Sequence, residues 1–308
     1  MMDHKKILIL GGNGFIGTNL GRYLAEEGHD VYSFDRVKPA SFNNNVHYLQ
    51  GDFFDDQTLR AVVEEMDVVY HAVSTINPGN STIEYMRGYE KDFIQTVKLC
   101  NLIRENKSRM VFLSSGGTIY GEQSRQPIKE SALPRPINHY GNLKLCIENT
   151  MLVFAYQNNA DMIIARISNP YGVGQDYKKG VGFIDAAIKK AISNEPIEIW
   201  GDGQIVRDYI YIDDVCCALA ALAEQPFLEN RVINISSGVG TSLNQIVSII
   251  QELNGEMDVC YKEARSVDLR EVVLDNTRLR DLIKKPLCDI GVGIEKYYYY
   301  IKGQEVIK

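Results

Sequence analysis

Three glycines near the start of the chain constrain its fold more than any other feature. Gly11, Gly14 and Gly17 recur at every third position, directly after the apolar run 7–10 and before leucines at helical spacing. The first permits a tight turn, the second lets the backbone approach a pyrophosphate, and the third lets the next helix pack near the strand. Free N–H groups at the start of that helix face the phosphates. This strand–turn–helix unit predicts a dinucleotide site made of Gly11, Gly14, Phe15, Ile16 and Gly17.

The next predicted strand, His29–Phe34, ends in an acidic residue. Asp35 lies about 20 positions beyond the glycines, where a carboxylate accepts hydrogen bonds from the adenosine ribose. Its charge repels a 2′-phosphate, which favours NAD over NADP. Arg36 follows directly and argues for the opposite choice.

Two further strand ends contribute candidates for the same site. Val46–Gln50 is followed by Asp52 and Phe53, and Asp67–Val73 runs into a loop of turn-forming residues. Asp52 has two interpretations: it holds the adenine amino group, or it caps a helix that starts at Gln57. Small residues after the second strand leave room for a cofactor, which adds Ala72, Val73 and Ser74. We interpret His71 as a packed histidine, because no acid is placed beside it.

Strands and helices alternate through the first half of the chain, including a long helical pattern over Ser81–Asn106. Alternation of this kind predicts a doubly wound, parallel Rossmann-type α/β sheet, with ligands beyond the carboxyl ends of its strands. The second half alternates helical patterns with short strands, which we interpret as a smaller α/β substrate lobe. We expect residues 1–168 and about 205–238 to form the dinucleotide-binding domain, and 169–204 and 239–308 the lobe.

A tyrosine and a lysine lie four residues apart at the start of another predicted helix. Tyr140 and Lys144 therefore share one helix face. An ammonium beside a phenol stabilises the phenolate and lowers its pKa from about 10. The pair predicts a tyrosine that takes a proton from an alcohol near neutral pH. The Tyr-x-x-x-Lys spacing alone is common on exposed helices, so the interpretation depends on the dinucleotide motif before it.

Composition excludes several other classes of protein. The net charge is −7 and no basic run occurs, which argues against nucleic acid as a partner. The six cysteines form no Cys-x-x-Cys pair and have no histidine cluster nearby, so they indicate reduced thiols of a cytoplasmic protein and no metal site. The first apolar run is too short for a signal peptide or a membrane span.

Together the glycine motif, the Ser114–Gly121 strand end and the Tyr140–Lys144 pair resemble the extended short-chain dehydrogenase/reductases. Within them the chain looks most like the NAD-dependent nucleotide-sugar epimerases of the UDP-glucose 4-epimerase type, over nearly its whole length. The resemblance implies cofactor contacts from Ser114, Tyr140, Lys144 and Ile167 as well. It also implies a homodimer formed through the helices within 81–106 and 140–158.

The resemblance further implies a UDP-sugar substrate and the residues that hold it. Two arginines clamp a diphosphate, an aromatic residue packs on uracil, and an asparagine contacts the sugar nucleotide. Two alternatives remain open: Trp200 belongs to the core, and Arg207 pairs with Asp208 or Asp213. The residues assigned to the substrate are Asn169, Phe183, Trp200, Arg207, Arg265, Asp268 and Val272.

Two positions depart from the family pattern. Many members carry a catalytic Ser or Thr where this chain has Gly116, so Ser115, or alternatively Thr118, is expected to supply the hydroxyl. The helix position that is usually Asn is Asp92. The Asp-Glu pair of the 4,6-dehydratases is replaced by Gly117 and Thr118, and the Glu of the UDP-glucuronate decarboxylases is also absent, which excludes both reactions.

The resemblance implies reversible inversion at C4 of a UDP-hexose through a transient 4-keto sugar. Tyr140 acts on the 4-hydroxyl proton, Ser115 relays or orients it, and Lys144 holds the nicotinamide ribose. Val272, a small residue at a position that gates the C2 side of the pocket, predicts that N-acetylated UDP-hexoses are also accepted. A nucleotide-4-ketosugar reductase using NAD(P)H is the alternative enzyme, and a non-catalytic NAD-binding sensor is the alternative outside enzymes.

Overall fold

The computed structural model of the protein describes residues 4–39, 41–179, 182–225, 231–264 and 269–305. Its strands are β1 (Lys6–Leu10), β2 (Asp30–Asp35), β3 (Val46–Gln50), β4 (Val68–His71), β5 (Arg109–Ser115), β6 (Met162–Ile167), β7 (Asn169–Tyr171), β8 (Ile197–Trp200), β9 (Val206–Tyr211), β10 (Val232–Ile235), β11 (Gly240–Ser242), β12 (Val259–Lys262) and β13 (Glu271–Val272). Its helices are α1 (Phe15–Glu26), α2 (Asp56–Val63), α3 (Tyr85–Arg87), the π-helix η1 (Gly88–Phe93), α4 (Ile94–Asn106), α5 (Gly116–Ile119), α6 (His139–Asn158), the 3-10 turn η2 (Tyr177–Lys179), α7 (Phe183–Ile192), α8 (Ile212–Glu224), α9 (Leu243–Asn254), α10 (Thr277–Leu282) and α11 (Ile290–Glu305).

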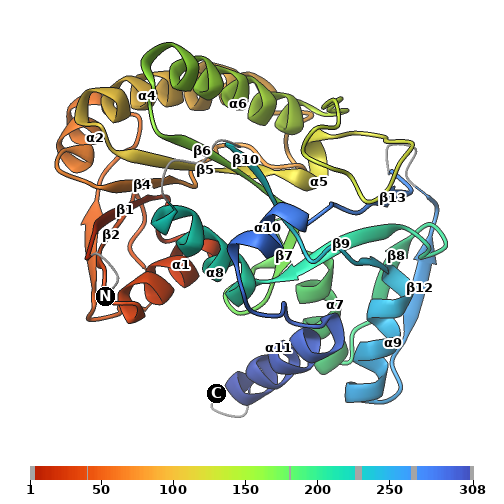
Figure 1. The fold of residues 1–308 in the computed structure, drawn as a ribbon. Coiled ribbons are helices and arrows are strands. Elements are labelled where there is room, and N and C mark those ends of the chain that lie inside the picture. Colours follow the sequence, from red (N-terminus) through yellow and green to blue (C-terminus); the bar gives the residue numbers. More distant parts are fainter. Residues whose placement is uncertain (1–3, 40, 180–181, 226–230, 265–268, 306–308) are drawn as a thin grey trace.

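A seven-stranded sheet forms the centre of the molecule (Figure 1). Its strand order is β10-β6-β5-β4-β1-β2-β3, and every pair in it is parallel. The order reverses direction on either side of β1, as in doubly wound sheets, so the predicted Rossmann-type fold is confirmed. The reversal places a crevice beyond the carboxyl ends of β1 and β4.

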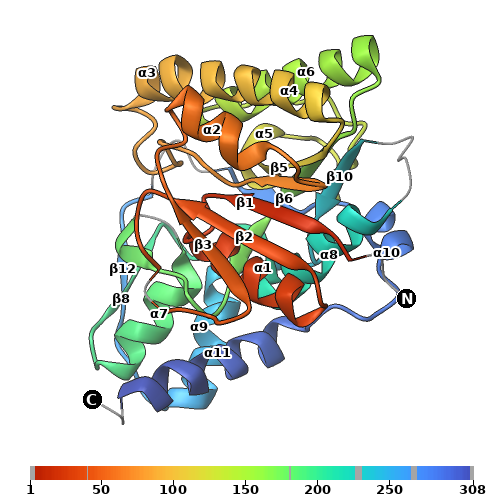
Figure 2. The same ribbon diagram turned by 90° about the vertical axis from the view of Figure 1, so that its left-hand side faces the viewer.

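Both faces of the sheet are covered by helices, and β1 shows how one short strand serves two cores. Ile7 and Ile9 pack into the cluster that contains α1 and α8, whereas Leu8 and Leu10 pack into the cluster with α2, α4 and α6. Alternate side chains of a strand point to opposite faces, so a continuous apolar run is required where both faces are buried. In Figure 2, α4 and α6 form the outer layer above the sheet, while α1 and α8 lie below it.

The second half of the chain builds a smaller lobe below the sheet (Figure 1). In it β9 pairs with β7, β11 and β13, β8 pairs with β12, and α7, α9 and α11 pack around them. Since β10 returns to the main sheet while β9 belongs to the lobe sheet, the chain crosses between the two parts within the segment 205–238. The proposed division into 1–168 with about 205–238, and 169–204 with 239–308, remains a prediction at that segment.

The long helix expected over Ser81–Asn106 begins only at Tyr85 and contains a π-helical stretch. Asn77 and Asn80 hold residues 77–84 in turns, because the Asn80 Oδ1 accepts from Asn77 N (2.7 Å) and the Asn77 Oδ1 accepts from Gly79 N (2.8 Å). Local bonds of this kind compete with helix formation. After one turn of α3 the backbone is π-helical over η1, and only α4 is a regular helix. No helix in the described part of the chain is long and apolar enough to cross a membrane.

Candidate active site

A cavity of about 210 Å³ lies beyond the carboxyl ends of β1, β2, β3 and β4. The residues that follow these four strands line it, as expected for a doubly wound sheet. Eight residues assigned to the cofactor from the sequence come together there: Gly11, Gly14, Asp35, Arg36, Phe53, Ala72, Val73 and Ser74.

The glycine turn has the shape that its spacing predicts. Gly11 has φ +81°, in the left-handed region that favours glycine. A Cβ on Gly17 would lie 2.5 Å from the Gly11 carbonyl oxygen, so any larger residue there would displace backbone. Gly14 is the N-cap of α1, and its side-chain-free backbone lines the cavity at the start of the helix. Such a helix start provides N–H groups and a dipole for an anionic pyrophosphate.

The carboxylate of Asp35 stands at the rim of the cavity. It accepts hydrogen bonds from the backbone N–H groups of Val37 (3.1 Å) and Asn13 (3.3 Å), which fix it at the end of β2. A fixed acid beside a pocket with a glycine turn fits an adenosine ribose without a 2′-phosphate. Arg36, which follows Asp35 in the chain, lines the same cavity.

Several other predicted cofactor residues lie away from this cavity. Phe15 and Gly17 line a second cavity of about 550 Å³, which shares Gly14 with the first, and Ile16 packs against the core. Asp52 is exposed and accepts from Phe54 N (3.0 Å). Its alternative role as a helix cap is wrong, because Asp55 caps α2 by accepting from Thr58 N.

The side chains of Ser114 and Ile167 are used inside the protein. Ser114 donates to Glu148 Oε1 (2.6 Å) in the buried interior, and Ile167 packs in the core beside α8. Cavity residues that sequence reasoning missed are Phe34, Gly51, Phe54 and Thr75. Each is a direct neighbour of an assigned residue, and adjacency at a strand end was the only signal that pointed to them.

Tyr140 and Lys144 lie on the first turns of α6, against the end of β5. The N-cap Asn138 starts this helix by accepting from Gly141 N (2.8 Å). Lys144 is 3% exposed, and its Nζ donates to the Leu113 carbonyl (3.0 Å). The same nitrogen lies 4.6 Å from the centre of the Phe112 ring and 5.6 Å from that of Tyr140.

The expected lowering of the Tyr140 pKa is wrong for the protein alone. Its side chain is half-buried; burial raises the pKa of Tyr140 to about 12, and the negative charge of Asp92 acts in the same direction. Burial also lowers the pKa of Lys144 to about 8, against the opposing effect of Asp92 and Glu148. The Lys144 ammonium donates to the Leu113 carbonyl and lies closer to the Phe112 ring than to the Tyr140 ring.

The strand end after β5 is crowded around Gly116. A Cβ there would meet Leu274 Cδ1 and lie 3.0 Å from the Arg166 carbonyl oxygen, so Ser or Thr at this position would require the Leu274 side chain to move. Ser115 is the N-cap of α5 but makes no side-chain cap. Thr118 Oγ1 is buried without a hydrogen-bond partner in the described part of the chain. Both remain candidates for the catalytic hydroxyl.

The residues assigned to the substrate come from the lobe and from the strands that lead into it. Asn169 donates to the Asp208 carbonyl (2.8 Å), which fixes its amide at the start of β7. The Asp208 carboxylate accepts from Ser168, Ser237, Gly238 and Leu274, and this set ties β9 to the main domain. Arg207 precedes it on β9 and donates to the Val206 carbonyl.

The other substrate candidates are less enclosed or are buried in apolar contacts. Trp200 is 41% exposed at the end of β8, so it is not a core residue. Phe183 begins α7 and packs partly on the core, and Val272 is 2% exposed in a cluster with Tyr120 and Leu274. Arg265 and Asp268 lie outside the described residues.

His71 is packed as the sequence suggested. Its Nε2 lies 2.8 Å from Thr96 Oγ1, and the Thr96 hydroxyl donates to the Asp92 carbonyl (2.6 Å), so Nε2 is the protonated ring nitrogen. Burial, and to a smaller extent the charge of Lys144, lowers the pKa of His71 to about 3.

The structure combines a doubly wound sheet, a glycine turn with an acid at the end of β2, and a Tyr-x-x-x-Lys pair beside β5. These features define a dinucleotide-dependent enzyme that acts on an alcohol or ketone. The chain belongs to the NAD-dependent epimerase/dehydratase family, whose model matches residues 7–236. It is a nucleotide-sugar enzyme of the extended short-chain dehydrogenase/reductases, and its cofactor is NAD.

Three relatives show how far the similarity extends. A putative UDP-glucose 4-epimerase of Methanocaldococcus jannaschii is 30% identical, over 96% of this chain and 98% of its own. A dTDP-4-dehydro-6-deoxyglucose reductase of Escherichia coli is 30% identical with the same coverage, 96% and 98%. The crystal structure of the Thermotoga maritima UDP-glucose 4-epimerase with UDP-glucose superposes with a TM-score of 0.91, at 28% identity over 97% of this chain and 99% of that one.

Proposed function

We propose that the protein interconverts the two C4 configurations of a UDP-hexose through a transient 4-keto sugar. The observation that supports this most directly is the position of Tyr140 and Lys144, on the first turns of the helix α6 that packs against β5. When bound, NAD supplies the reversible oxidation and reduction at C4. Full-length similarity to a putative UDP-glucose 4-epimerase supports the choice of substrate.

In this proposal Tyr140 accepts the proton of the 4-hydroxyl and returns it. Its pKa of about 12 in the protein alone means that Tyr140 becomes a proton acceptor only once ligands complete the site. Ser115 or Thr118 orients the hydroxyl, and the unpartnered Thr118 Oγ1 supports the second choice. Lys144, fixed by the Leu113 carbonyl, keeps a positive charge behind the ring.

The lobe supplies the groups that would hold the nucleotide. We assign Asn169, which begins β7, to the sugar, Trp200, which ends β8, to the base, and Arg207, the second residue of β9, to the diphosphate. Arg265 and Asp268 are assigned to phosphate and ribose. Val272 at the C2 side predicts that UDP-GlcNAc and UDP-GalNAc are substrates together with UDP-Glc and UDP-Gal.

A conversion assay with these four UDP-sugars, without added cofactor, tests the proposal. We expect interconversion within the plain pair, because an epimerase regenerates its cofactor in every cycle. Conversion of UDP-Glc and UDP-Gal with strict rejection of UDP-GlcNAc and UDP-GalNAc would contradict only the role assigned to Val272.

The second candidate is a nucleotide-4-ketosugar reductase, because the Escherichia coli relative carries that activity in its name. Tyr140, Lys144 and a reduced nicotinamide suffice for it. A reductase consumes one reduced cofactor for each turnover, whereas the epimerase does not. Stoichiometric loss of NADH absorbance with a 4-ketosugar, and no conversion of UDP-sugars, would favour the reductase.

We also propose that the protein is a homodimer formed through α4 and α6. Apolar side chains are exposed along this outer layer, on α3, α4 and α6: Met86, Ile94, Val153 and Tyr156. Tyr156 is 92% exposed. The helices α4 and α6 pack side by side in this outer layer (Figure 2). Exposed apolar residues on such a surface are typical of a protein interface.

A further inference from the structure

A buried carboxylate in the lobe joins three of its segments. Asp185, on the first turn of α7, is 0% exposed. Its Oδ1 accepts from the Tyr297 hydroxyl of α11 (2.6 Å), and its Oδ2 accepts from Tyr177 N in η2 (2.8 Å). Lys189, one turn further along α7, places its Nζ 2.7 Å from Oδ1 and 2.8 Å from Oδ2. A buried charge requires partners of this kind, and both carboxylate oxygens have them.

The segment that this carboxylate holds connects two residues assigned to the substrate. One is Asn169, which begins β7, and the other is Phe183, which begins α7. Tyr177 lies between them in the chain, and Asp185 follows Phe183 by two positions. The hydrogen bond from Tyr177 N to Asp185 therefore holds η2 against the first turn of α7.

Lys189 ties the same segment to β7. Its Nζ donates to the Gln175 carbonyl (3.2 Å) and lies 5.6 Å from the centre of the Tyr177 ring. The Gln175 side chain in turn donates to the carbonyl of Pro170 (3.0 Å), which directly follows Asn169. A continuous set of contacts thus leads from the buried carboxylate to the residue next to Asn169.

Helix α11 is joined to this arrangement through one tyrosine. It packs against α7 in the lobe (Figure 1). Tyr297 of α11 is 1% exposed, and its hydroxyl donates directly to the carboxylate of Asp185. Hydrogen bonds to a charged oxygen are stronger than those between neutral groups. The contact therefore links α11 to the segment that contains Tyr177.

We propose that Asp185 is a positioning residue of the substrate site. It sets where Asn169 and Phe183 stand, and its bond to Tyr297 makes α11 part of the support of that site. The inference deepens the proposed function, because that proposal assigns Asn169 and Phe183 to the substrate. A buried ion pair often contributes no more stability than apolar residues of the same shape, so what Asp185 adds is one fixed position of the segment.

Two neighbouring tyrosines of α11 provide a matched pair of variants. Tyr297→Phe removes one hydrogen bond of Asp185 and keeps the ring. Tyr298→Phe is the control, because Tyr298 is also 1% exposed but donates to Asn254 Oδ1 of α9 (2.9 Å). Each substitution removes one buried hydroxyl from the same helix, so the two should lower stability to a similar extent. An effect seen only in Tyr297→Phe comes from the contact with Asp185.

Asp185→Asn is the stronger variant. It keeps the shape of the side chain and removes the charge that faces Lys189, so both effects described below should be larger than in Tyr297→Phe. Should Asp185→Asn fail to fold, the comparison of Tyr297→Phe with Tyr298→Phe decides alone.

The first measurement needs no substrate. Hydrogen exchange followed by mass spectrometry reports the protection of the peptide that contains Tyr177. We expect faster exchange of this peptide in Tyr297→Phe than in the wild type or in Tyr298→Phe, because the acceptor of the Tyr177 amide is held less firmly. Equal exchange in the two variants would overturn the inference, whatever substrate the enzyme takes.

The second measurement is the steady-state conversion of UDP-glucose. We expect KM in Tyr297→Phe to exceed that of Tyr298→Phe by up to about tenfold, the range of one hydrogen bond, with kcat within about twofold. Equal KM values in the two variants would also overturn the inference. A wild-type protein that converts no UDP-sugar would contradict the proposed function, while the exchange difference would still support the hold of Asp185 on the segment.

Discussion

Tyr140 is the residue on which the chemistry depends. Its side chain is half-buried, and Tyr140→Phe removes one oxygen and little packing. We expect UDP-sugar binding within about twofold of the wild type and turnover reduced by about 10³-fold, the range for loss of a general acid–base group. Calorimetry for binding and a steady-state assay for turnover measure the two effects.

Tyr156→Phe is the control for this substitution, since Tyr156 is on the same helix and exposed. It should behave like the wild type in both assays. Near-normal turnover in Tyr140→Phe would remove Tyr140 from the mechanism.

His71 makes stability dependent on pH in the acid range. Its pKa of about 3 in the folded protein is below the unfolded value of 6.5, so the folded state binds fewer protons. The stabilisation is complete above pH 6.5 and is lost as the pH falls towards 3. Urea unfolding at pH 7.5 and pH 4.5 should show a loss of a few kcal/mol, as an order of magnitude.

His71→Phe should remove most of this loss, since the ring already packs between Phe53 and Phe112. His29, whose pKa burial also lowers, leaves a remaining acid sensitivity. An acid dependence that is identical in His71→Phe and in the wild type would contradict the assignment.

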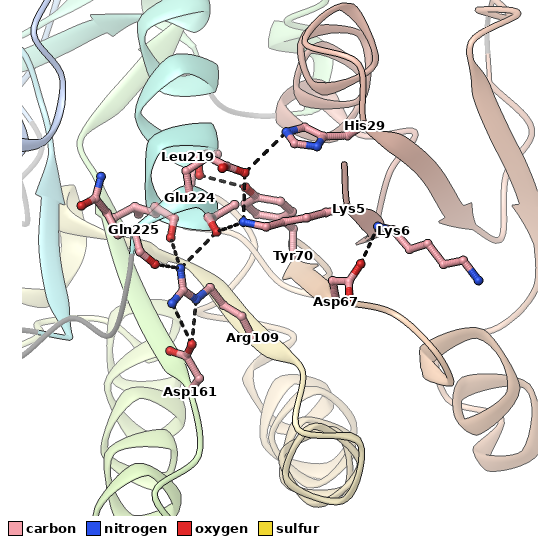
Figure 3. Close-up of polar contacts among 12 residues, drawn as sticks. Lys5, Lys6, His29, Asp67, Tyr70, Arg109, Asp161, Leu219, Glu224 and Gln225 are labelled. Atoms are coloured by element: carbon pink, nitrogen blue, oxygen red, sulfur yellow. Dashed lines mark hydrogen bonds and ion pairs between the residues drawn. The ribbon is translucent and has the colours of Figure 1, made fainter. Parts of the chain in front are cut away.

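Two cations contact the carboxyl end of helix α8 (Figure 3). They lie at the end of the main sheet that is opposite the active site. Arg109 Nη1 donates to the carbonyls of Leu222 (2.9 Å) and Ala223 (3.1 Å), and Lys5 Nζ also donates to Ala223 (2.9 Å). Positive groups at this end donate hydrogen bonds to the last carbonyls of the helix and interact favourably with the negative end of its dipole. Asp161 holds the guanidinium in place, 2.8 Å from its Nε.

Arg109→Met should therefore destabilise the fold by about 2–3 kcal/mol, because buried carbonyls and the carboxylate of Asp161 lose a charged partner. Lys6→Met is the control, since the Lys6 Nζ pairs with the exposed Glu65 and the substitution should change stability by less than about 1 kcal/mol. Urea unfolding measures both. Equal effects of the two substitutions would show that the α8 contacts do not contribute.

Elements that depend on local sequence were predicted well, and those that depend on tertiary packing were not. The glycine turn was predicted because a positive φ at Gly11 and a close approach at Gly17 demand glycine whatever surrounds them. The π-helix η1 was missed, because apolar periodicity does not distinguish a π-helical stretch from an α-helix. The Tyr140 pKa was missed as well: spacing places Lys144 on its face, but only the fold shows where Nζ points.

At the scale of the whole molecule, the sequence predicted the sheet but not the route between the two parts. The alternation of strands and helices predicted that the strands of the main sheet run parallel. The short strand β9 carries no sequence signal for its pairing with β7, β11 and β13. The Asp208 carboxylate joins the parts, because it accepts from residues before and after β9 in the chain.

The proposed dimer is tested by charges placed on its face. Ile94→Lys combined with Val153→Lys should give a monomer, because two desolvated lysines in an apolar interface cost several kcal/mol. Val292→Lys on α11 is the control on another part of the surface. Sedimentation velocity measures the mass. A wild-type protein that sediments as a monomer would contradict the proposal.

The most direct test of the central claim follows the hydrogen on C4 of the substrate. Purified protein is incubated with UDP-glucose deuterated at C4, without added cofactor, and the product is examined by NMR and mass spectrometry. The account predicts UDP-galactose that keeps the deuterium at C4, because the same hydrogen is removed and returned within one closed site. Product that has lost the label to solvent, or no UDP-galactose at all, would contradict it.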